Sequence, residues 1–143
     1  MALKIIKFGG SSIADAEKIR HVANIVKDKK KDDNLVIVIS ALGGVTDTLK
    51  NLAETVASGK PKDPMLTSLV KRHRKCIQDL CLQVEIDDQC HLDEYFSQLE
   101  SDLSSIAKAK QLSSQLQDKI LSYGELLSTT IIAKYLSHIG IAA

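Results

Sequence analysis

The chain has 143 residues, of which 44% are hydrophobic, and its 19 basic and 18 acidic residues leave a formal net charge of +1. This size suits one domain with its own core. The balanced charge, the aromatic content of 3% and the absence of Trp argue against a protein that binds nucleic acid or an anionic membrane. No apolar run approaches the about 20 residues of a membrane helix, and the first residues lack the pattern of a signal peptide, so we expect a cytoplasmic protein.

The amino-terminal part of the sequence predicts a strand, a helix and a second strand. The stretch from Leu3 to Phe8 is mostly apolar and stops at a pair of glycines. Asp15 is a suitable N-cap for a helix whose apolar residues recur at helical spacing over residues 19–26. The run from Leu35 to Ile39 is continuous and β-branched, which is typical of a central parallel strand buried on both faces. Together these elements predict a right-handed βαβ unit and an α/β fold.

The middle of the sequence predicts helices that pack against one another. A helix with apolar residues over 49–56 ends at Gly59. Three further apolar stripes follow at helical spacing, over residues 66–84, 95–106 and 112–120. We expect these stripes to form an all-helical insertion beside the sheet, at about residues 65–122.

The last part of the sequence predicts one more helix and the beginning of a strand. The helix extends from Glu125 to about His138 and is stopped by Gly140. Residues 141–143 have the composition of a third strand. Two strands and part of a third are fewer than the about four to six of a typical sheet, so we expect the chain to be part of a larger domain.

Residues Lys7 to Ser12, with the sequence KFGGSS, form the first cluster of chemical interest. Lys7 stands at the carboxyl end of the first predicted strand, where open α/β sheets bind ligands, and the glycine pair lets backbone N–H groups approach an anion. The N-terminus of the following helix would favour an anion further, and the lysine could neutralise a transferring phosphoryl group. The cluster is neither a Walker A loop nor a GxGxxG motif, and an ordinary strand–turn–helix with a solvated lysine explains it equally well.

The second cluster, SALGGVTD from Ser40 to Asp47, takes the same place after the second predicted strand. The two glycine turns are therefore expected at the same edge of the sheet. The hydroxyl groups of Ser40 and Thr46 suit a carboxylate or phosphate oxygen. Alternatively, Thr46 or Asp47 caps the next helix, which is compatible with ligand binding because a capped helix end still presents N–H groups.

The third cluster, SYGELLS from Ser122 to Ser128, places Glu125 at the predicted start of the last helix. A carboxylate there can bind the ammonium group of a substrate. A glutamate that favours the first helical turn only through the helix dipole is the alternative, and for this cluster alone it is the commoner case.

The three clusters, in this order, resemble those of the aspartokinases, which belong to the amino-acid kinase superfamily. That family begins with a strand ending in K-F-G-G-[TS]-S, continues with a strand ending in Ser-Ala before a glycine turn and Thr-[Asn/Asp], and later has Gly-Glu with a nearby Ser. The matching segments are Lys7–Ser12, Ser40–Asp47 and Gly124–Ser128. The resemblance implies the amino-terminal part of a carbamate-kinase-like three-layer αβα sandwich, with a parallel sheet core and a helical insertion.

The activity implied by the resemblance is transfer of the γ-phosphoryl group of ATP to the β-carboxylate of L-aspartate. This reaction is the first step of lysine, threonine and methionine biosynthesis. ATP would be used with Mg²⁺, although no metal ligand can be assigned in this sequence. A full-length enzyme of this kind is expected to be a homo-oligomer.

Site residues can be carried over from the family one by one. Lys7 would contact the transferring phosphoryl group, and the phosphate cradle would be lined by Gly9, Gly10 and Ser11. Ser11 stands where threonine is commoner in the family. Ser40, Ala41 and Thr46 would contact aspartate. Glu125 would hold aspartate through the ammonium group of this substrate.

Several family features have no counterpart within residues 1–143. These are the aspartate-binding arginine, most adenine contacts, the remainder of the kinase domain and the regulatory ACT domains, so we expect the isolated chain to be inactive. A glutamate or acetylglutamate kinase is the alternative enzyme, and a half-domain that only folds or associates is the alternative outside catalysis. A zinc site is not predicted, because the spacing of His73, Cys76, Cys81, Cys90 and His91 fits no familiar ligand pattern.

Overall fold

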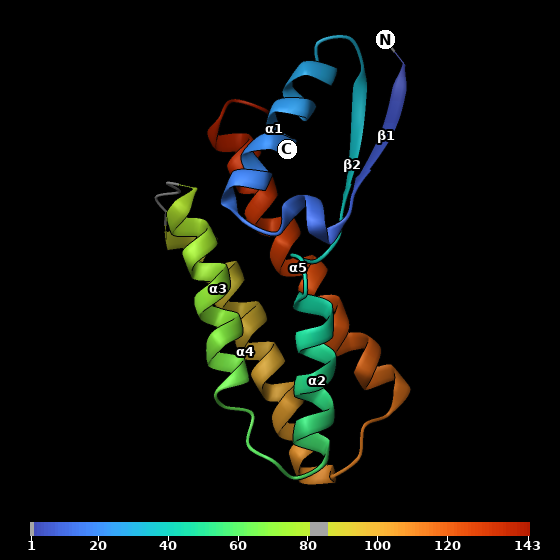
Figure 1. Cartoon of the computed structure of the whole chain (residues 1–143), viewed down its shortest axis with the longest axis vertical. Coiled ribbons are helices and arrows are strands. Elements are labelled where there is room, and N and C mark those ends of the chain that lie inside the picture. Colours follow the sequence, from blue (N-terminus) through green and yellow to red (C-terminus); the bar gives the residue numbers. More distant parts are fainter. Residues whose placement is uncertain (1, 81–85) are drawn as a thin grey trace.

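The computed structural model describes residues 2–80 and 86–143, with the backbone alone for residues 86–90. Within these ranges the elements follow in the order β1 (Leu3–Phe8), η1 (Gly10–Ile13), α1 (Ala16–Lys29), β2 (Asn34–Ile39), α2 (Val45–Ala57), α3 (Met65–Asp79), α4 (Ile86–Ala109) and α5 (Ser114–His138). The element η1 is a single turn of 3₁₀ helix. The sheet and α1 form one end of the molecule, and α2, α3, α4 and the first half of α5 form a helical bundle at the other end (Figure 1).

The two strands pair in parallel, from Leu3 opposite Asn34 to Phe8 opposite Ile39. The helix α1 connects them, so the predicted strand–helix–strand unit and the α/β class are confirmed. Asp15 caps α1 as predicted, since its carboxylate accepts a hydrogen bond of 2.9 Å from the backbone N–H of Lys18.

The two faces of the sheet have different environments. Ile6 and Phe8 of β1 and alternate residues of β2 pack toward α1 and α5. The opposite face carries Leu3, Ile5, Val36 and Val38, which are 68%, 71%, 46% and 42% exposed. The prediction that β2 is buried on both faces is therefore wrong for this chain, because the described helices cover only one face.

The helix α5 differs from its prediction. A short helix near residues 112–120 and a separate helix from Glu125 were expected, but one continuous helix spans Ser114–His138. Its N-cap is Ser113, whose hydroxyl accepts the backbone N–H of Leu116 at 3.2 Å. Glu125 thus lies in the middle of a helix and not at its start. A glycine inside a helix costs about 1 kcal/mol relative to alanine, and here tertiary packing of Gly124 offsets that cost.

The end of the chain also departs from its prediction. Gly140, with φ of 85°, ends α5 as expected. Residues 141–143 are irregular and not a third strand, because the chain turns back after the helix and the N–H of Ile141 donates to the carbonyl of Leu136 at 2.9 Å. None of the described helices combines the length and the apolar character that a membrane-spanning segment needs.

Other helix boundaries refine the predictions for the middle of the chain. Gly44, in the left-handed conformation with φ of 79°, is the N-cap of α2. The alternative in which Thr46 or Asp47 caps this helix is therefore wrong, since both residues lie in its first turn. The helix α3 ends at Asp79, and the part of its predicted stripe at residues 81–84 lies outside the described residues.

Candidate functional site

The two glycine turns meet at the junction between the sheet and the helical bundle (Figure 1). A Cβ atom on Gly10 would lie 2.8 Å from the carbonyl oxygen of Ala41 and 3.3 Å from the Cα atom of Gly43. A Cβ atom on Gly43 would lie 3.1 Å from the carbonyl oxygen of Gly10. The turns are thus in direct backbone contact, which only residues without a side chain allow. The prediction that both turns face one edge of the sheet is confirmed.

The helix α5 contacts the same place. A Cβ atom on Gly124 would lie 2.7 Å from the Cβ atom of Ala41. The hydroxyl of Ser128, one turn further along the helix, donates a hydrogen bond of 2.7 Å to the carbonyl oxygen of Ser40. All three clusters from the sequence therefore converge, although residues 124–128 contribute the middle of a helix and not its first turn.

Both turns carry backbone donors that are not used within the fold. In the part of the chain that the structure describes, the N–H groups of residues 9–11 and of residues 41–44 donate to no other residue. Successive free N–H groups in a turn form a concave site for an anion. The turns therefore offer two adjacent sets of donors, one after each strand.

The first turn is followed by η1 and not directly by a long helix. The N–H of Ser12 donates to the carbonyl of Gly9 at 3.0 Å, and α1 begins only at Ala16. The element that directly follows the glycine pair is therefore the short η1, and the first turn of α1, which Asp15 caps, comes after it.

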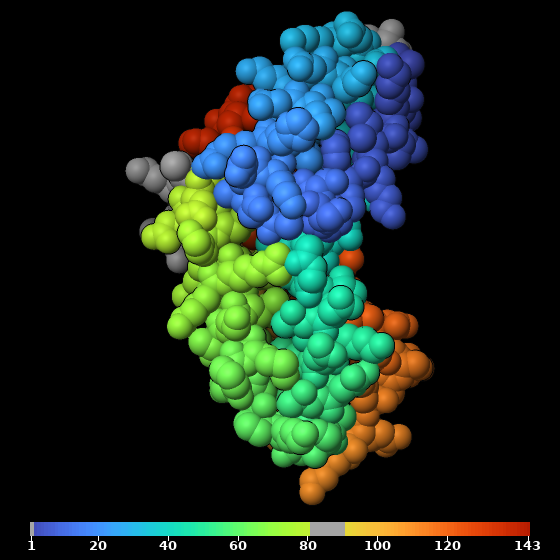
Figure 2. Space-filling model, viewed as in Figure 1, coloured from blue at the N-terminus to red at the C-terminus, as the bar shows by residue number. Residues whose placement is uncertain are grey.

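The predicted site residues differ in exposure. Lys7, Gly9, Ser11 and Thr46 are exposed, Gly10, Ser40 and Glu125 are half-buried, and Ala41 is buried. The Lys7 side chain leaves β1 on the outer face of the sheet, beside Val38. Within the described residues its ammonium group has neither an ion pair nor a hydrogen bond, so it is available to a ligand. The outline of the molecule narrows between the amino-terminal end, which carries β1, and the helical bundle (Figure 2).

Arg72 is a cation near the turns that the sequence did not reveal. It lies on α3, and its Nη2 atom donates to the carbonyl oxygen of Ala14 at 3.2 Å. Its Nη1 atom lies 3.9 Å from the position of a Cβ atom on Gly44. A charged residue on a polar helix face carries no sequence signal of such a contact, which depends on how α3 packs against the segment that follows β1.

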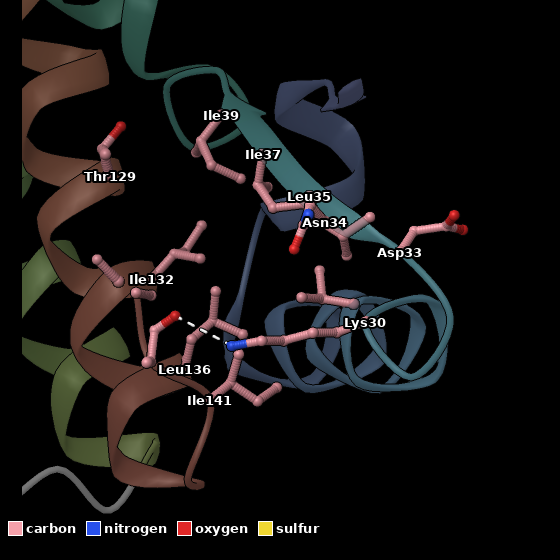
Figure 3. Close-up of a pocket in the computed structure, with 14 residues that line it drawn as sticks. Lys30, Asp33, Asn34, Leu35, Ile37, Ile39, Thr129, Ile132, Leu136 and Ile141 are labelled. Atoms are coloured by element: carbon pink, nitrogen blue, oxygen red, sulfur yellow. Dashed lines mark hydrogen bonds between the residues drawn. The ribbon is translucent and has the colours of Figure 1, made fainter. Parts of the chain in front are cut away.

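An apolar cavity lies away from the turns. It has a volume of about 550 Å³ and lies between β2 and α5. The side chains of Leu35, Ile37 and Ile39 point across it toward Ile132 and Leu136 (Figure 3). A shallower groove of about 580 Å³ beside α1 includes Ser11. The apolar cavity contains none of the predicted site residues, whose accessible groups lie at the surface.

The cysteine and histidine residues do not assemble a metal site in the described part of the chain, where no three His, Cys, Asp or Glu side chains are grouped to hold an ion. Cys81 and the Cys90 side chain lie outside the described residues. Burial raises the pKa of the Cys76 thiol to about 11, so this thiol is protonated at neutral pH.

His73 is fully buried on α3. Its Nδ1 atom lies 2.8 Å from the carbonyl oxygen of Leu69, and its ring meets that of Phe96 edge-on with centroids 5.8 Å apart. Its Nε2 atom has no hydrogen-bond partner within the described residues. Burial lowers the pKa of this imidazole, so the neutral form is favoured in the fold.

Comparisons with known proteins agree with one another. The model of the amino acid kinase family matches residues 2–143. The chloroplastic aspartokinase 1 of Arabidopsis thaliana is 35% identical over 143 residues, which cover 97% of this chain and 24% of that protein. The aspartokinase of Mycobacterium tuberculosis is 49% identical over 72 residues, which cover 48% of this chain and 17% of that protein.

Solved structures give the same result for the fold. Aspartokinase III of E. coli, in complex with lysine and aspartate, superposes with a TM-score of 0.82 at 25% identity and covers 99% of this chain. The aspartate kinase of Clostridium acetobutylicum superposes with a TM-score of 0.69 at 28% identity and covers 96% of it. The chain spans 30% and 29% of these two structures, so it corresponds to less than a third of their length.

Proposed function

Because the chain belongs to the amino acid kinase family, we propose that it is the amino-terminal part of the catalytic domain of an aspartokinase, with the helical insertion at about residues 65–122. The full-length enzyme transfers the γ-phosphoryl group of ATP to the β-carboxylate of L-aspartate, at the start of lysine, threonine and methionine biosynthesis. The observation that carries the proposal is the contact between the two glycine turns and their free N–H groups. Adjacent donor sets suit a reaction between two anions.

The first turn serves the phosphates of ATP. Gly9, Gly10 and Ser11 offer backbone N–H groups that are not used within the described residues. Lys7 precedes them with a free ammonium group on an exposed side chain. This cation neutralises charge on the phosphoryl group as it is transferred.

The second turn serves aspartate. The N–H of Ala41 and the hydroxyl groups of Ser40 and Thr46 are donors for a substrate carboxylate. Glu125 follows Gly124, which packs on Ala41, and its carboxylate binds the substrate ammonium group. Its position in the middle of α5 leaves this role intact, because the role needs a nearby carboxylate and not a helix end.

The reaction needs no general base. The β-carboxylate, with an ordinary pKa of about 3.9, is ionised at neutral pH and attacks directly. Its oxygen forms a bond to the γ-phosphorus, the bond from that phosphorus to the β–γ bridging oxygen breaks, and ADP leaves. The two turns therefore act by positioning the reactants and by screening their repulsion. Magnesium, when bound with ATP, supplies further charge neutralisation, and no described group of side chains in this chain is arranged to hold it.

The ligands of a relative are consistent with the proposed substrates. Aspartokinase III of E. coli has been solved in complex with aspartate and ADP, and that structure superposes on this chain with a TM-score of 0.82. The amino acid bound to that protein is the substrate that the proposal assigns to the second turn, and the bound ADP is the product that ATP leaves after the proposed transfer.

The test is Lys7→Ala in the full-length enzyme. Loss of a cation that stabilises the transferring group lowers kcat by about 100-fold or more, while KM for aspartate changes by less than about three-fold because Lys7 does not bind that substrate. Lys27→Ala, at an exposed lysine in the last turn of α1, is the matched control and is expected to behave as wild type. A Lys7→Ala enzyme with a near-wild-type kcat refutes the role of this lysine.

Separate measurements test the two alternatives, a related amino-acid kinase and a chain that folds or associates without catalysis. Assays with aspartate, glutamate and acetylglutamate distinguish an aspartokinase from a related amino-acid kinase. The exposed apolar face with Leu3, Ile5, Val36 and Val38 favours an isolated chain that folds or associates without catalysis. Calorimetry of the 143-residue chain with ATP and with aspartate tests this second reading, since clear binding of aspartate would contradict it.

A further inference from the structure

The backbone of Ser40 is held from two sides at the carboxyl end of β2. Its N–H donates to the carbonyl oxygen of Phe8 in β1 at 3.2 Å. Its carbonyl oxygen accepts the hydroxyl of Ser128 in α5 at 2.7 Å. One residue thereby connects both strands to the long helix, immediately before the second glycine turn.

The hydrogen bond from Ser128 is protected from water. Ser128 is 0% exposed, on a helix face that otherwise buries apolar residues. Its hydroxyl also lies 3.2 Å from the carbonyl oxygen of Glu125 in the preceding turn. Serine hydroxyls in helices commonly bond only to such a preceding carbonyl, but here the distance to Ser40 is shorter, so the distant carbonyl is the main acceptor.

The Ser40 carbonyl controls the direction of the next N–H group. The carbonyl oxygen of Ser40 and the amide hydrogen of Ala41 belong to one planar trans peptide and point in opposite directions. Because Ser128 draws the oxygen toward α5, the Ala41 N–H is directed away from that helix. Within the described residues this N–H donates to no other group, so it is available to a ligand.

We propose that Ser128 is a positioning residue for aspartate binding, acting by orienting the Ser40–Ala41 peptide so that the Ala41 N–H is presented to the substrate carboxylate. This inference rests on the proposed function, because it assumes that aspartate binds at the second turn. Ser128 is buried and makes its contact through the backbone of Ser40, so it does not touch the substrate itself. Gly124 supports the same arrangement, since it brings α5 close enough for the hydroxyl to reach.

The experiment uses steady-state kinetics of the full-length enzyme with Ser128→Ala and Ser128→Cys. Alanine removes the donor, and KM for aspartate is expected to rise about ten-fold, with KM for ATP changed less than about two-fold. Cysteine is of similar size and is a weaker donor, so its KM for aspartate is expected between those of the other two. Ser122→Ala is the matched control, because its hydroxyl bonds at 2.7 Å to Lys119 of the same helix and is exposed.

The outcomes separate this inference from the proposed function. A wild-type enzyme that does not phosphorylate aspartate overturns both. An active wild type with an unchanged aspartate KM in Ser128→Ala overturns the inference alone. The inference is also overturned if Ser128→Ala raises the KM values for aspartate and ATP together and lowers the melting temperature, since that result indicates a general packing role. A selective, graded rise in the aspartate KM supports the inference.

Discussion

The close approach of α5 to the second glycine turn makes Gly124→Ala a sharp test of the packing. In a helix considered alone, alanine is more favourable than glycine by about 1 kcal/mol. In this fold the added Cβ atom would lie 2.7 Å from the Cβ atom of Ala41, and 3.4 Å from side-chain carbons of Leu49 and Val45. These two effects oppose each other, so the sign of the stability change distinguishes them.

We expect the steric clash of the new Cβ atom to outweigh the gain in helix propensity. Overpacking in a tight core costs about 1–3 kcal/mol, and a contact between two Cβ atoms falls at the upper end of that range because neither atom can move without its backbone. After the gain in helix propensity of about 1 kcal/mol, the expected net loss is about 2 kcal/mol. Urea unfolding of the chain followed by circular dichroism should show a lower midpoint with an unchanged m-value.

Two further variants complete this test. Gly9→Ala is a matched glycine control, because Gly9 has an extended backbone with φ of −79° and no atom within 4 Å of a new Cβ. It should leave stability unchanged or raise it by up to about 1 kcal/mol. Adding Ala41→Gly to Gly124→Ala removes the opposing Cβ atom and should recover much of the loss. If Gly124→Ala alone stabilises the chain by about 1 kcal/mol, as propensity predicts, the close packing of α5 is refuted.

Two other substitutions test the buried histidine and the contact between the turns. Burial lowers the pKa of His73 in the folded chain below the ordinary value of 6.5. As pH falls, the unfolded chain therefore binds a proton at this histidine before the folded chain does. The free energy of unfolding should then decrease below about pH 6.5, by up to about 1.4 kcal/mol per pH unit. His73→Leu should remove the part of this pH dependence that comes from the histidine. If urea unfolding of the wild-type and variant chains depends on pH equally between pH 7.5 and 5.5, the prediction is contradicted. Gly10→Ala forces a Cβ atom to within 2.8 Å of the Ala41 carbonyl oxygen, so unfolding should become easier by about 1–3 kcal/mol, and unchanged stability would argue against contact between the turns.

The parts of the fold that the sequence predicted depend on local patterns. Helical spacing over residues 19–26 and the N-cap at Asp15 specify α1 without reference to any distant residue. The first glycine pair stops β1 as expected, β2 ends at Ile39 as expected, and parallel pairing then brings the two turns together. Convergence of the turns was predictable because it follows from topology and not from side-chain detail.

The features that the sequence did not predict depend on distant contacts. Gly124 suggested a helix boundary, but its packing against Ala41 allows α5 to continue through it. The apolar character of Val36 and Val38 suggested burial on both faces, whereas no described residue covers that face. The contact of Arg72 with Ala14 connects two segments whose separation in the sequence hides their proximity. Local preference gave the wrong result wherever tertiary packing opposed it.

If the proposed function holds, the contact between Gly10 and Gly43 sets the geometry of the reaction. The first turn would hold the phosphates and the second would hold the aspartate carboxylate, so the separation of the turns fixes the distance between nucleophile and phosphorus. Near-attack geometry requires reacting atoms about 3–3.5 Å apart, a tolerance smaller than the width of one methyl group. A side chain at either glycine would separate the donors by more than this tolerance. Under the proposed function, the backbone contact would therefore constrain the phosphoryl transfer as directly as Lys7 would, although neither glycine has a side chain to contribute.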